Sequence, residues 1–424
     1  MTTISESISS YIDKHFDAEC AFLAELVKVP SDNPPGDCDA HARRAKELLE
    51  GLGLEVEAHA IPEALVRANG MISVTNLVVR QRFGDGTGPV IALNAHGDVV
   101  PPGQGWTHDP YGAEIADDGN GKAMFGRGVA VSKSDFATYT FSLLALRELA
   151  AQNVVPGGST LNGAIELQLT YDEEAGGEIG PKWLLDNGLS KANIAISAGF
   201  SYAVVTAHNG CLHLEVIVHG KQGHAAMPER GIDAIAAATQ ILTAIYASRD
   251  ALKAHPSKTP GIAHPTLNVG LIEGGINTNV VPDRLSFRID RRIIPEESPA
   301  AAEAELRALI QAAADRIPGI RIEIRRILLS LPLVKLPGAD RLTETLQKRG
   351  KEFFGVDIGE HGVPIYTDAR HYTAAGIPAV LYGAGPRTLA EANGHSADEN
   401  VRLEDLRRAT KTVAAALADL LSSG

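Results

Sequence analysis

The segment from Leu93 to Pro101 constrains the fold most, because an apolar run ends abruptly in His96, Gly97 and Asp98 before two prolines. This pattern predicts a buried strand that presents polar side chains at its carboxyl end. Side chains two residues apart share one face of an extended chain, so His96 and Asp98 can meet, with the imidazole binding a metal and the carboxylate fixing its tautomer. Taken alone, the pair is more typical of a structural histidine beside an aspartate turn.

Two other segments supply companions for this pair. The strand-like run 164–169 is followed by Asp172, Glu173 and Glu174 and then by a glycine turn. The segment 393–399 contains His395 and precedes a C-terminal helix. Histidine and carboxylate groups that follow strands are candidate ligands for a divalent metal.

The order of the remaining segments predicts the architecture. At 424 residues the chain exceeds one usual core, so two domains are expected. Helical patterns at 11–29 and 40–52, and a helix beginning at Ser134, alternate with strand-like runs, which indicates an α/β sheet with helices on both faces.

The middle of the chain has a different pattern. Strands and helices there follow the order βαββαβ, which is typical of a ferredoxin-like unit; they are expected at 212–218, 232–247, 266–271, 284–289, 299–316 and 320–324. We therefore expect a mixed-sheet α/β catalytic domain at 1–208 and 326–424, with an α+β lid inserted at 209–325.

A series of short motifs occurs in order along nearly the whole chain: His96–Pro101, Gly105–Pro110, Gly126–Gly128 with Lys133, Asp172–Glu174, Gly220–His224, Asn279–Pro282, Thr367–Arg370 and the segment around His395. In these motifs the chain resembles the metal-dependent hydrolases that include acetylornithine deacetylase, succinyl-diaminopimelate desuccinylase, aminoacylase and glutamate carboxypeptidase. The resemblance implies hydrolysis of a C–N bond in a small N-substituted amino acid. It also implies a lid that pairs two subunits into a homodimer.

Two positions depart from the pattern of this family, which normally holds two metal ions with five protein ligands. Val131 stands where a bridging aspartate is expected, and Gly199 lies where an acidic ligand is expected. Valine cannot bridge two dications, whose mutual repulsion would then be costly. We therefore expect one zinc or manganese ion, held by His96, Glu174 and His395 with an open position for water.

The resemblance places His96 at one metal position and the other two ligands at the second, so a single ion would need an intermediate placement or a recruited ligand. Candidates for recruitment are His208, His213, Asp135 and Asp368, each more typical of a structural or substrate-facing residue.

The resemblance also assigns roles in catalysis and substrate binding. Glu173 is the expected general base, since a carboxylate beside a metal ligand can move a proton from water to the leaving nitrogen, although it could also be part of a solvated acidic turn. His224 is expected to stabilise the oxyanion, often across the dimer, or merely to cap the next helix. The expected substrate contacts are Asn279, Arg292 (or its neighbour Arg291) and the backbone at Gly383.

Composition agrees with such an enzyme. Apolar residues make up 44% of the chain without a continuous membrane-spanning run, and the first residues lack the features of a secretory signal. The net charge of −13 argues against a nucleic-acid surface. Three widely separated cysteines support neither a disulfide framework nor a cysteine metal cluster, so the cytoplasm is the expected location.

Three functions stay open at this point. The first is the amide hydrolase described above. The second keeps the fold but changes the chemistry, to hydrolytic deamination or acyl transfer, because Val131 and Gly199 alter the metal site. The third is a metal-poor binding protein, against which Asp98 and Glu173 count. A Ser132–Lys133 nucleophile is disfavoured, because adjacent residues rarely face each other.

Overall fold

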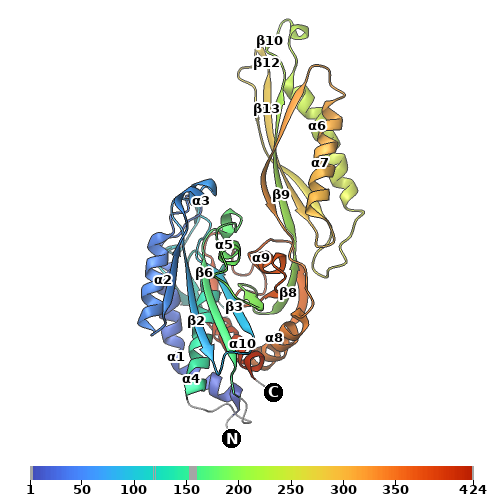
Figure 1. Ribbon diagram of the computed structural model, residues 1–424. Coiled ribbons are helices and arrows are strands. Elements are labelled where there is room, and N and C mark those ends of the chain that lie inside the picture. Colours follow the sequence, from blue (N-terminus) through green and yellow to red (C-terminus); the bar gives the residue numbers. More distant parts are fainter. Residues whose placement is uncertain (1–2, 118, 120, 152–159, 423–424) are drawn as a thin grey trace. The chain divides into compact units, whose positions relative to one another are not determined.

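The computed structural model describes residues 3–117, 119, 121–151 and 160–422 (Figure 1). The chain divides into two compact units. The first contains residues 1–206, 335–361 and 367–424, and the second contains residues 207–334 and 362–366. Each unit has its own sheet and its own apolar core.

A mixed sheet forms the centre of the first unit. Among the described residues it has eight strands in the order β1-β2-β6-β3-β7-β16-β8-β15. In that order the strands are Val56–Ala60, Thr75–Phe83, Gly163–Thr170, Val90–His96, Ile194–Ser197, Ala379–Leu381, Ala203–His208 and Gly359–Val363. The strands β6, β3, β7 and β16 run parallel, whereas β1, β2 and β8 pair antiparallel to their neighbours. The central parallel strands therefore bring several carboxyl ends to one edge of the sheet.

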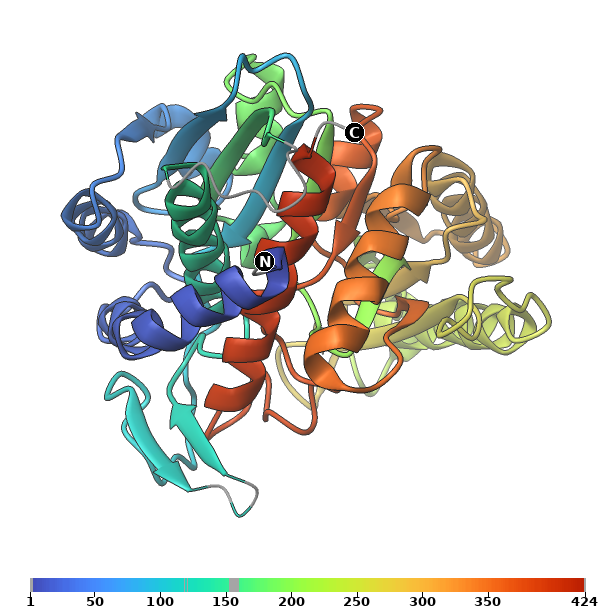
Figure 2. The same ribbon diagram turned by 90° about the horizontal axis from the view of Figure 1, so that it is seen from below.

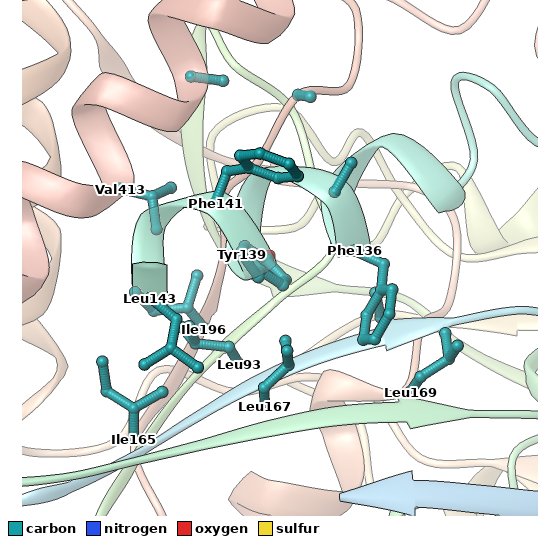
Figure 3. Packing of buried hydrophobic residues seen from close by; sticks show 14 of the residues in the cluster. Leu93, Phe136, Tyr139, Phe141, Leu143, Ile165, Leu167, Leu169, Ile196 and Val413 are labelled. Atoms are coloured by element: carbon teal, nitrogen blue, oxygen red, sulfur yellow. The ribbon is translucent and has the colours of Figure 1, made fainter. Parts of the chain in front are cut away.

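Helices cover both faces of this sheet. On one face α4 (Lys133–Ala151) packs on β3 and β6 and is itself covered by α1 (Ile4–Val27) and α10 (Leu403–Leu421) (Figure 2). Figure 3 shows side chains of α4, among them Phe136 and Tyr139, lying against Leu93 and Leu167 of the strands. On the other face the short helices α5 (Pro181–Asp186) and α9 (Ala369–Ala374) pack near Ala92 and Ala195.

The alternation of side chains along the strands explains this two-sided burial. Leu93 belongs to the large core, whereas its neighbour Ala92 belongs to the small cluster on the opposite face. The other helices of the unit are α2 (Asp39–Gly51), α3 (Glu63–Ala68) and α8 (Ala339–Phe354). A small antiparallel sheet, β17-β5-β4, joins Asn400–Arg402, Lys122–Phe125 and Glu114–Asp117.

The second unit is an antiparallel sheet with two helices on one face. The strand order is β11-β13-β9-β14, formed by Thr266–Gly274, Arg284–Ile293, Gly210–His219 and Arg321–Ser330. Helices α6 (Ala234–Leu252) and α7 (Pro299–Ala314) pack on alternate residues of β9, beginning with Leu212 and Leu214. A two-stranded antiparallel sheet of β10 (Gly223–His224) and β12 (Val280–Val281) completes the unit.

The expected fold class is confirmed, with a mixed sheet and a βαββαβ insert. Boundaries differ by a few residues. The first helix begins at Ile4 rather than near residue 11, and the helix expected to start at Ser134 begins at Lys133. Within the described residues, no helix is long and apolar enough to cross a membrane.

Candidate metal centre and active site

The carboxyl ends of β3 and β6 place the main candidate residues side by side. The two strands are parallel neighbours, with His96 opposite Thr170 in the register. Beyond Thr170 the chain turns through Asp172, whose φ is 108°, into a single 3-10 turn at Glu173–Ala175. The turn directs Glu173 and Glu174 back towards His96, so two segments that are distant in sequence meet.

Three ligand-type side chains converge here. Atoms of His96, Glu173 and Glu174 all lie within 4.8 Å of one another, and His96 Nε2 is 3.9 Å from Glu173 Oε2. Imidazole nitrogen and carboxylate oxygens are donors that suit zinc or manganese. This spacing is what a divalent cation would require.

Burial and charge shift the pKa values at this point. Burial raises the pKa of Glu173 well above its usual value, and the nearby carboxylates of Glu174, Asp368 and Asp98 add to the rise, opposed by His96. Burial alone would lower the pKa of His96, but Asp98, Glu173 and Glu174 raise it well above its ordinary range. A carboxyl group with a raised pKa is suited to proton transfer.

Asp98 contacts His96 through its backbone as well as through its side chain. His96 Nδ1 lies 2.9 Å from the backbone carbonyl oxygen of Asp98 and 3.5 Å from its carboxylate Oδ1, so the carbonyl is the nearer tautomer-fixing acceptor. The carboxylate Oδ2 accepts hydrogen bonds from Asn33 Nδ2 and from the backbone N–H of Glu174. Asp98 therefore fixes the position of Glu174, while His96 keeps Nε2 for a ligand.

His395 lies beside this group but is less enclosed. Its Nε2 is 3.3 Å from Glu174 Oε1, and its side chain is 51% exposed, compared with 7% for His96. The hydrogen bond to Glu174 is the main reason that the pKa of His395 is raised. Two of the expected ligands, His96 and Glu174, belong to the compact group, and its third member is Glu173. The third expected ligand, His395, contacts Glu174 from outside that group.

Asp368 is a buried carboxylate whose importance the sequence left open. It stands just before α9 and is 2% exposed, and neither carboxylate oxygen accepts a hydrogen bond from the described residues. Burial raises the pKa of Asp368 to about 6, and His96, Asp98 and Glu174 are among the charges it senses. Its neighbour Arg370 donates to the carbonyl oxygen of Gly176 and so holds the turn that follows Glu174. The motif Thr367–Arg370 was the only sequence signal for these roles.

The loop that contains Val131 is anchored by Glu399, a residue whose role sequence reasoning missed. Glu399 Oε1 accepts hydrogen bonds from the backbone N–H groups of Gly128, Ala130 and Val131, and Oε2 pairs with buried Arg127. The link depends on the pairing of β17 with β5, which no local motif specifies. The carboxylate of Glu399 thus holds this loop by its backbone.

Ser132 and Lys133 are occupied by structural contacts. Ser132 Oγ donates to the carbonyl oxygen of His96 and accepts from its backbone N–H. Lys133 is buried and donates to the carbonyl oxygens of Leu26 and Val29, and burial lowers its pKa to about 8. Neither contact is the pairing that a serine–lysine nucleophile would need.

Two glycines show how closely the strand ends are packed. A Cβ added to Gly199 would lie 2.6 Å from Leu381 Cβ and 2.8 Å from backbone atoms of Leu381 and Tyr382, so this position has no room for an acidic side chain. A Cβ on Gly383 would collide with Asp135 Oδ1. Asp135 accepts a hydrogen bond from the backbone of Ala384, and burial raises its pKa to about 7.

The remaining expected residues belong to the second unit. His224 and Asn279 are exposed at the two-stranded sheet of β10 and β12, where the backbone of Ala225 donates to the carbonyl oxygen of Asn279. Arg292 is partly exposed on β13 and donates two hydrogen bonds to Asp290. Arg291, the alternative to Arg292, is buried and pairs with Glu297. His208 and His213, considered as recruited ligands, are also in this unit.

Several known proteins are similar to this chain in sequence. Residues 206–318 match the peptidase dimerisation domain. Acetylornithine deacetylase of Myxococcus xanthus is 28% identical over 378 residues, covering 88% of this chain and 90% of the relative. Succinyl-diaminopimelate desuccinylase of Rhodospirillum centenum is 28% identical over 406 residues, covering 92% and 94%.

A solved structure extends the likeness to the whole fold. The YXEP protein of Bacillus subtilis, a dinuclear metal-binding peptidase of the M20 family, superposes with a TM-score of 0.65 at 17% identity, covering 96% of this chain and 99% of that one. The chain is thus similar in sequence to these two enzymes and in fold to a protein of the M20 family. The resemblance inferred from the motifs is confirmed, and with it the enzyme class, a hydrolase of C–N bonds.

M20 enzymes depend on divalent metal, and the residues of this chain offer donors for such an ion. His96, Glu173 and Glu174 offer a compact donor set, with Asp98 Oδ1 and both oxygens of Asp368 left without hydrogen-bond donors nearby. The closed space at Gly199 and the apolar side chain of Val131 remove two donors from a second ion. The side chains of His96, Glu173 and Glu174 therefore fit a divalent cation.

Proposed function

We propose that this protein is a metal-dependent hydrolase that cleaves the amide bond of a small N-substituted amino acid and works with one divalent cation, zinc or manganese. The convergence of His96, Glu173 and Glu174 at the adjacent ends of β3 and β6 is the observation that supports this most directly. The names of the relatives support the substrate class, because they act on acetylated or succinylated amino acids.

In this proposal His96, Glu174 and His395 hold the cation, which when bound supplies Lewis acidity to the scissile carbonyl and to the attacking water. Glu173 takes a proton from that water and returns it to the departing nitrogen. Its raised pKa supports the second step, because a protonated carboxyl must persist long enough to act as an acid. Asp98 and Arg370 are positioning residues, since they hold Glu174 and the turn behind it.

The lid supplies the contacts to substrate in the same proposal. His224 donates to the oxyanion, and Asn279 binds a polar group of the substrate. Arg292 grips the substrate carboxylate through its planar guanidinium, whereas buried Arg291 is committed to Glu297. Gly383 has no side chain and so lets its segment pass close to Asp135, and in this proposal its backbone contacts the substrate.

We also propose that the protein is a homodimer paired through its lid. Among the residues that the structure describes, the edge strand β11 is paired on one side only, and Leu271 and Ile272 on it are each 60% exposed. An exposed apolar edge strand is a template for pairing with a second copy. Light scattering after size-exclusion chromatography should give twice the chain mass, and Ile272→Lys should shift it towards the monomer.

Metal content and hydrolysis together test the function. Elemental mass spectrometry of the protein purified without chelator should find about one ion per chain fewer in His96→Ala than in the wild type. Wild type should hydrolyse members of a panel of N-acetyl, N-succinyl and dipeptide substrates, and lose that activity on chelation. A difference of two ions would replace the single-ion centre with a dinuclear one.

The altered positions Val131 and Gly199 favour a second candidate, a binding protein of the same fold without catalysis. This alternative predicts no ion at His96 after reconstitution and no hydrolysis of any substrate in the panel. It also predicts that Glu173→Gln changes ligand affinity and nothing else. Measurable turnover that disappears in Glu173→Gln would exclude it.

A further inference from the structure

A second group of ligand-type side chains lies within the lid unit itself. Cys211 and His213 are two residues apart on β9, so they share one face of the sheet, opposite to the face covered by α6 and α7. The antiparallel register places Asp290 of β13 directly opposite His213. Three different donor types therefore meet on a single sheet face.

The distances between these groups are short. Cys211 Sγ is 3.1 Å from His213 Nε2, and His213 Nε2 is 3.2 Å from Asp290 Oδ2. All three donor atoms lie within 4.8 Å of one another. The Cys211 side chain is buried, whereas those of His213 and Asp290 are about one-third exposed, so an ion could enter from the solvent.

We propose that Cys211, His213 and Asp290 form a zinc site that is held by the lid unit alone. Thiolate, imidazole and carboxylate are all ordinary zinc ligands, and three protein ligands leave a fourth tetrahedral position for water. Once the thiol has lost its proton, the Cys211 thiolate and the Asp290 carboxylate carry two negative charges, which balance the charge of the zinc ion. No part of this site depends on the proposed catalytic residues.

One neighbouring charge limits the affinity of the site. Arg292 donates from Nε to Asp290 Oδ1 at 3.0 Å and from Nη2 to Oδ2 at 3.1 Å. An ion at Asp290 must share or replace these hydrogen bonds, and it is repelled by the guanidinium. The guanidinium carbon of Arg292 lies over the ring of Tyr366, 6.0 Å from the ring centre. This contact helps to keep Arg292 near the cluster. The site is therefore expected to bind zinc less tightly than a site without such a neighbour.

Cobalt provides a test that separates this site from the one at His96. A thiolate bound to Co²⁺ gives an intense charge-transfer absorption in the near ultraviolet, which a site of nitrogen and oxygen donors lacks. Metal-free full-length protein titrated with Co²⁺ should develop this band, and zinc should remove it. His96→Ala should keep the band, because His96 is not a ligand of the lid site.

Variants of the three cysteines give matched controls. Cys211→Ser should abolish the band, whereas Cys20→Ser and Cys38→Ser should retain it, since both lie buried in the first unit. His213→Ala and Asp290→Asn should weaken Co²⁺ binding by about 10-fold or more. Circular dichroism should confirm that each variant is folded. A folded wild type without the band at saturating Co²⁺, or a band that survives in Cys211→Ser, would overturn the proposal.

Discussion

The group at His96 and the group at Cys211 each bring three ligand-type side chains within 4.8 Å, yet they are built in opposite ways. The first lies where parallel strands end and relies on a turn, so its carboxylates come from outside the regular sheet. The second lies on the face of an antiparallel sheet and relies only on register and alternation. A strand end can collect residues from several loops, whereas a sheet face offers a fixed grid.

The charges around the two groups differ as well. Near His96 the surrounding charged groups are mostly carboxylates, including Asp98 and Asp368, so the site carries excess negative charge that a dication would neutralise. Near Cys211 a guanidinium already neutralises the carboxylate. The comparison teaches that similar spacing of donors does not imply similar affinity, because the neighbouring charges decide how much a cation gains.

The largest effect that would sharpen this contrast is expected from Glu173→Gln. Removing the proton carrier should lower kcat/KM by about 10²–10⁴-fold while the ion at His96 is retained. Steady-state kinetics and elemental mass spectrometry on the same preparation measure both quantities. Glu178→Gln is a matched control, because Glu178 is an exposed residue five positions further on. If the metal disappears together with the activity, Glu173 is a ligand and His395 is not needed as the third one.

A buried carboxylate that belongs to neither group separates the effect of burial from that of a metal site. Glu19 on α1 is fully buried, accepts a hydrogen bond from Thr410 Oγ1, and has one oxygen without a partner among the described residues. Burial raises its pKa to about 8. Because the folded-state pKa exceeds the unfolded one, the protonated form stabilises the fold below about pH 4.5, and this contribution is lost as the pH rises through 8.

Glu19→Gln should therefore remove a pH dependence of stability. Between pH 5.5 and 8.5 the wild type should lose on the order of 2–4 kcal/mol of unfolding free energy relative to the variant. Urea denaturation at both pH values measures this difference, and any constant cost of the amide cancels. If the unfolding free energies of the two proteins change equally with pH, Glu19 is solvated or paired in solution.

Much of the first site could be predicted from the sequence, because its signals are local. An apolar run that ends in His96 and another that ends before Glu173 identify two strand ends, and parallel neighbours bring such ends together. The absence of an acidic residue at Val131 and Gly199 was equally visible. Asp98 was found, but its contact with the backbone of Glu174 required the turn geometry.

The other contacts of the two groups depended on pairings between strands that no local sequence pattern encodes. Glu399 reaches the Val131 loop because β17 pairs with β5, from segments more than 260 residues apart. Cys211 was judged by the spacing of cysteines, and that criterion ignores a single cysteine beside histidine and aspartate. The His213–Asp290 contact joins residues 77 positions apart and follows only from the register of β9 with β13.

The next prediction tests whether Gly199 closes the second metal position by packing. Gly199→Ala places a methyl group 2.6 Å from Leu381 Cβ, so the neighbouring strand must shift. Overpacking of this kind should cost about 1–3 kcal/mol of unfolding free energy, measured by urea denaturation. Gly359→Ala is the control, since nothing lies within 4 Å of the added carbon there. Equal stability of the two variants would show that room for a ligand exists at 199.

The smallest expected effect concerns Arg292, whose positive charge distinguishes the group at Cys211 from the group at His96. Arg292→Gln removes the charge beside Asp290, so zinc should bind the lid cluster several-fold to about 10-fold more tightly, as measured by competition with a chromophoric chelator. Arg288→Gln is a matched control on the same strand face, because Arg288 pairs with Glu215 instead. The same Arg292 variant should raise KM for substrates with a carboxylate. Tighter zinc binding without a change in KM would separate Arg292 from substrate recognition and leave it only as the residue that weakens zinc binding at the cluster.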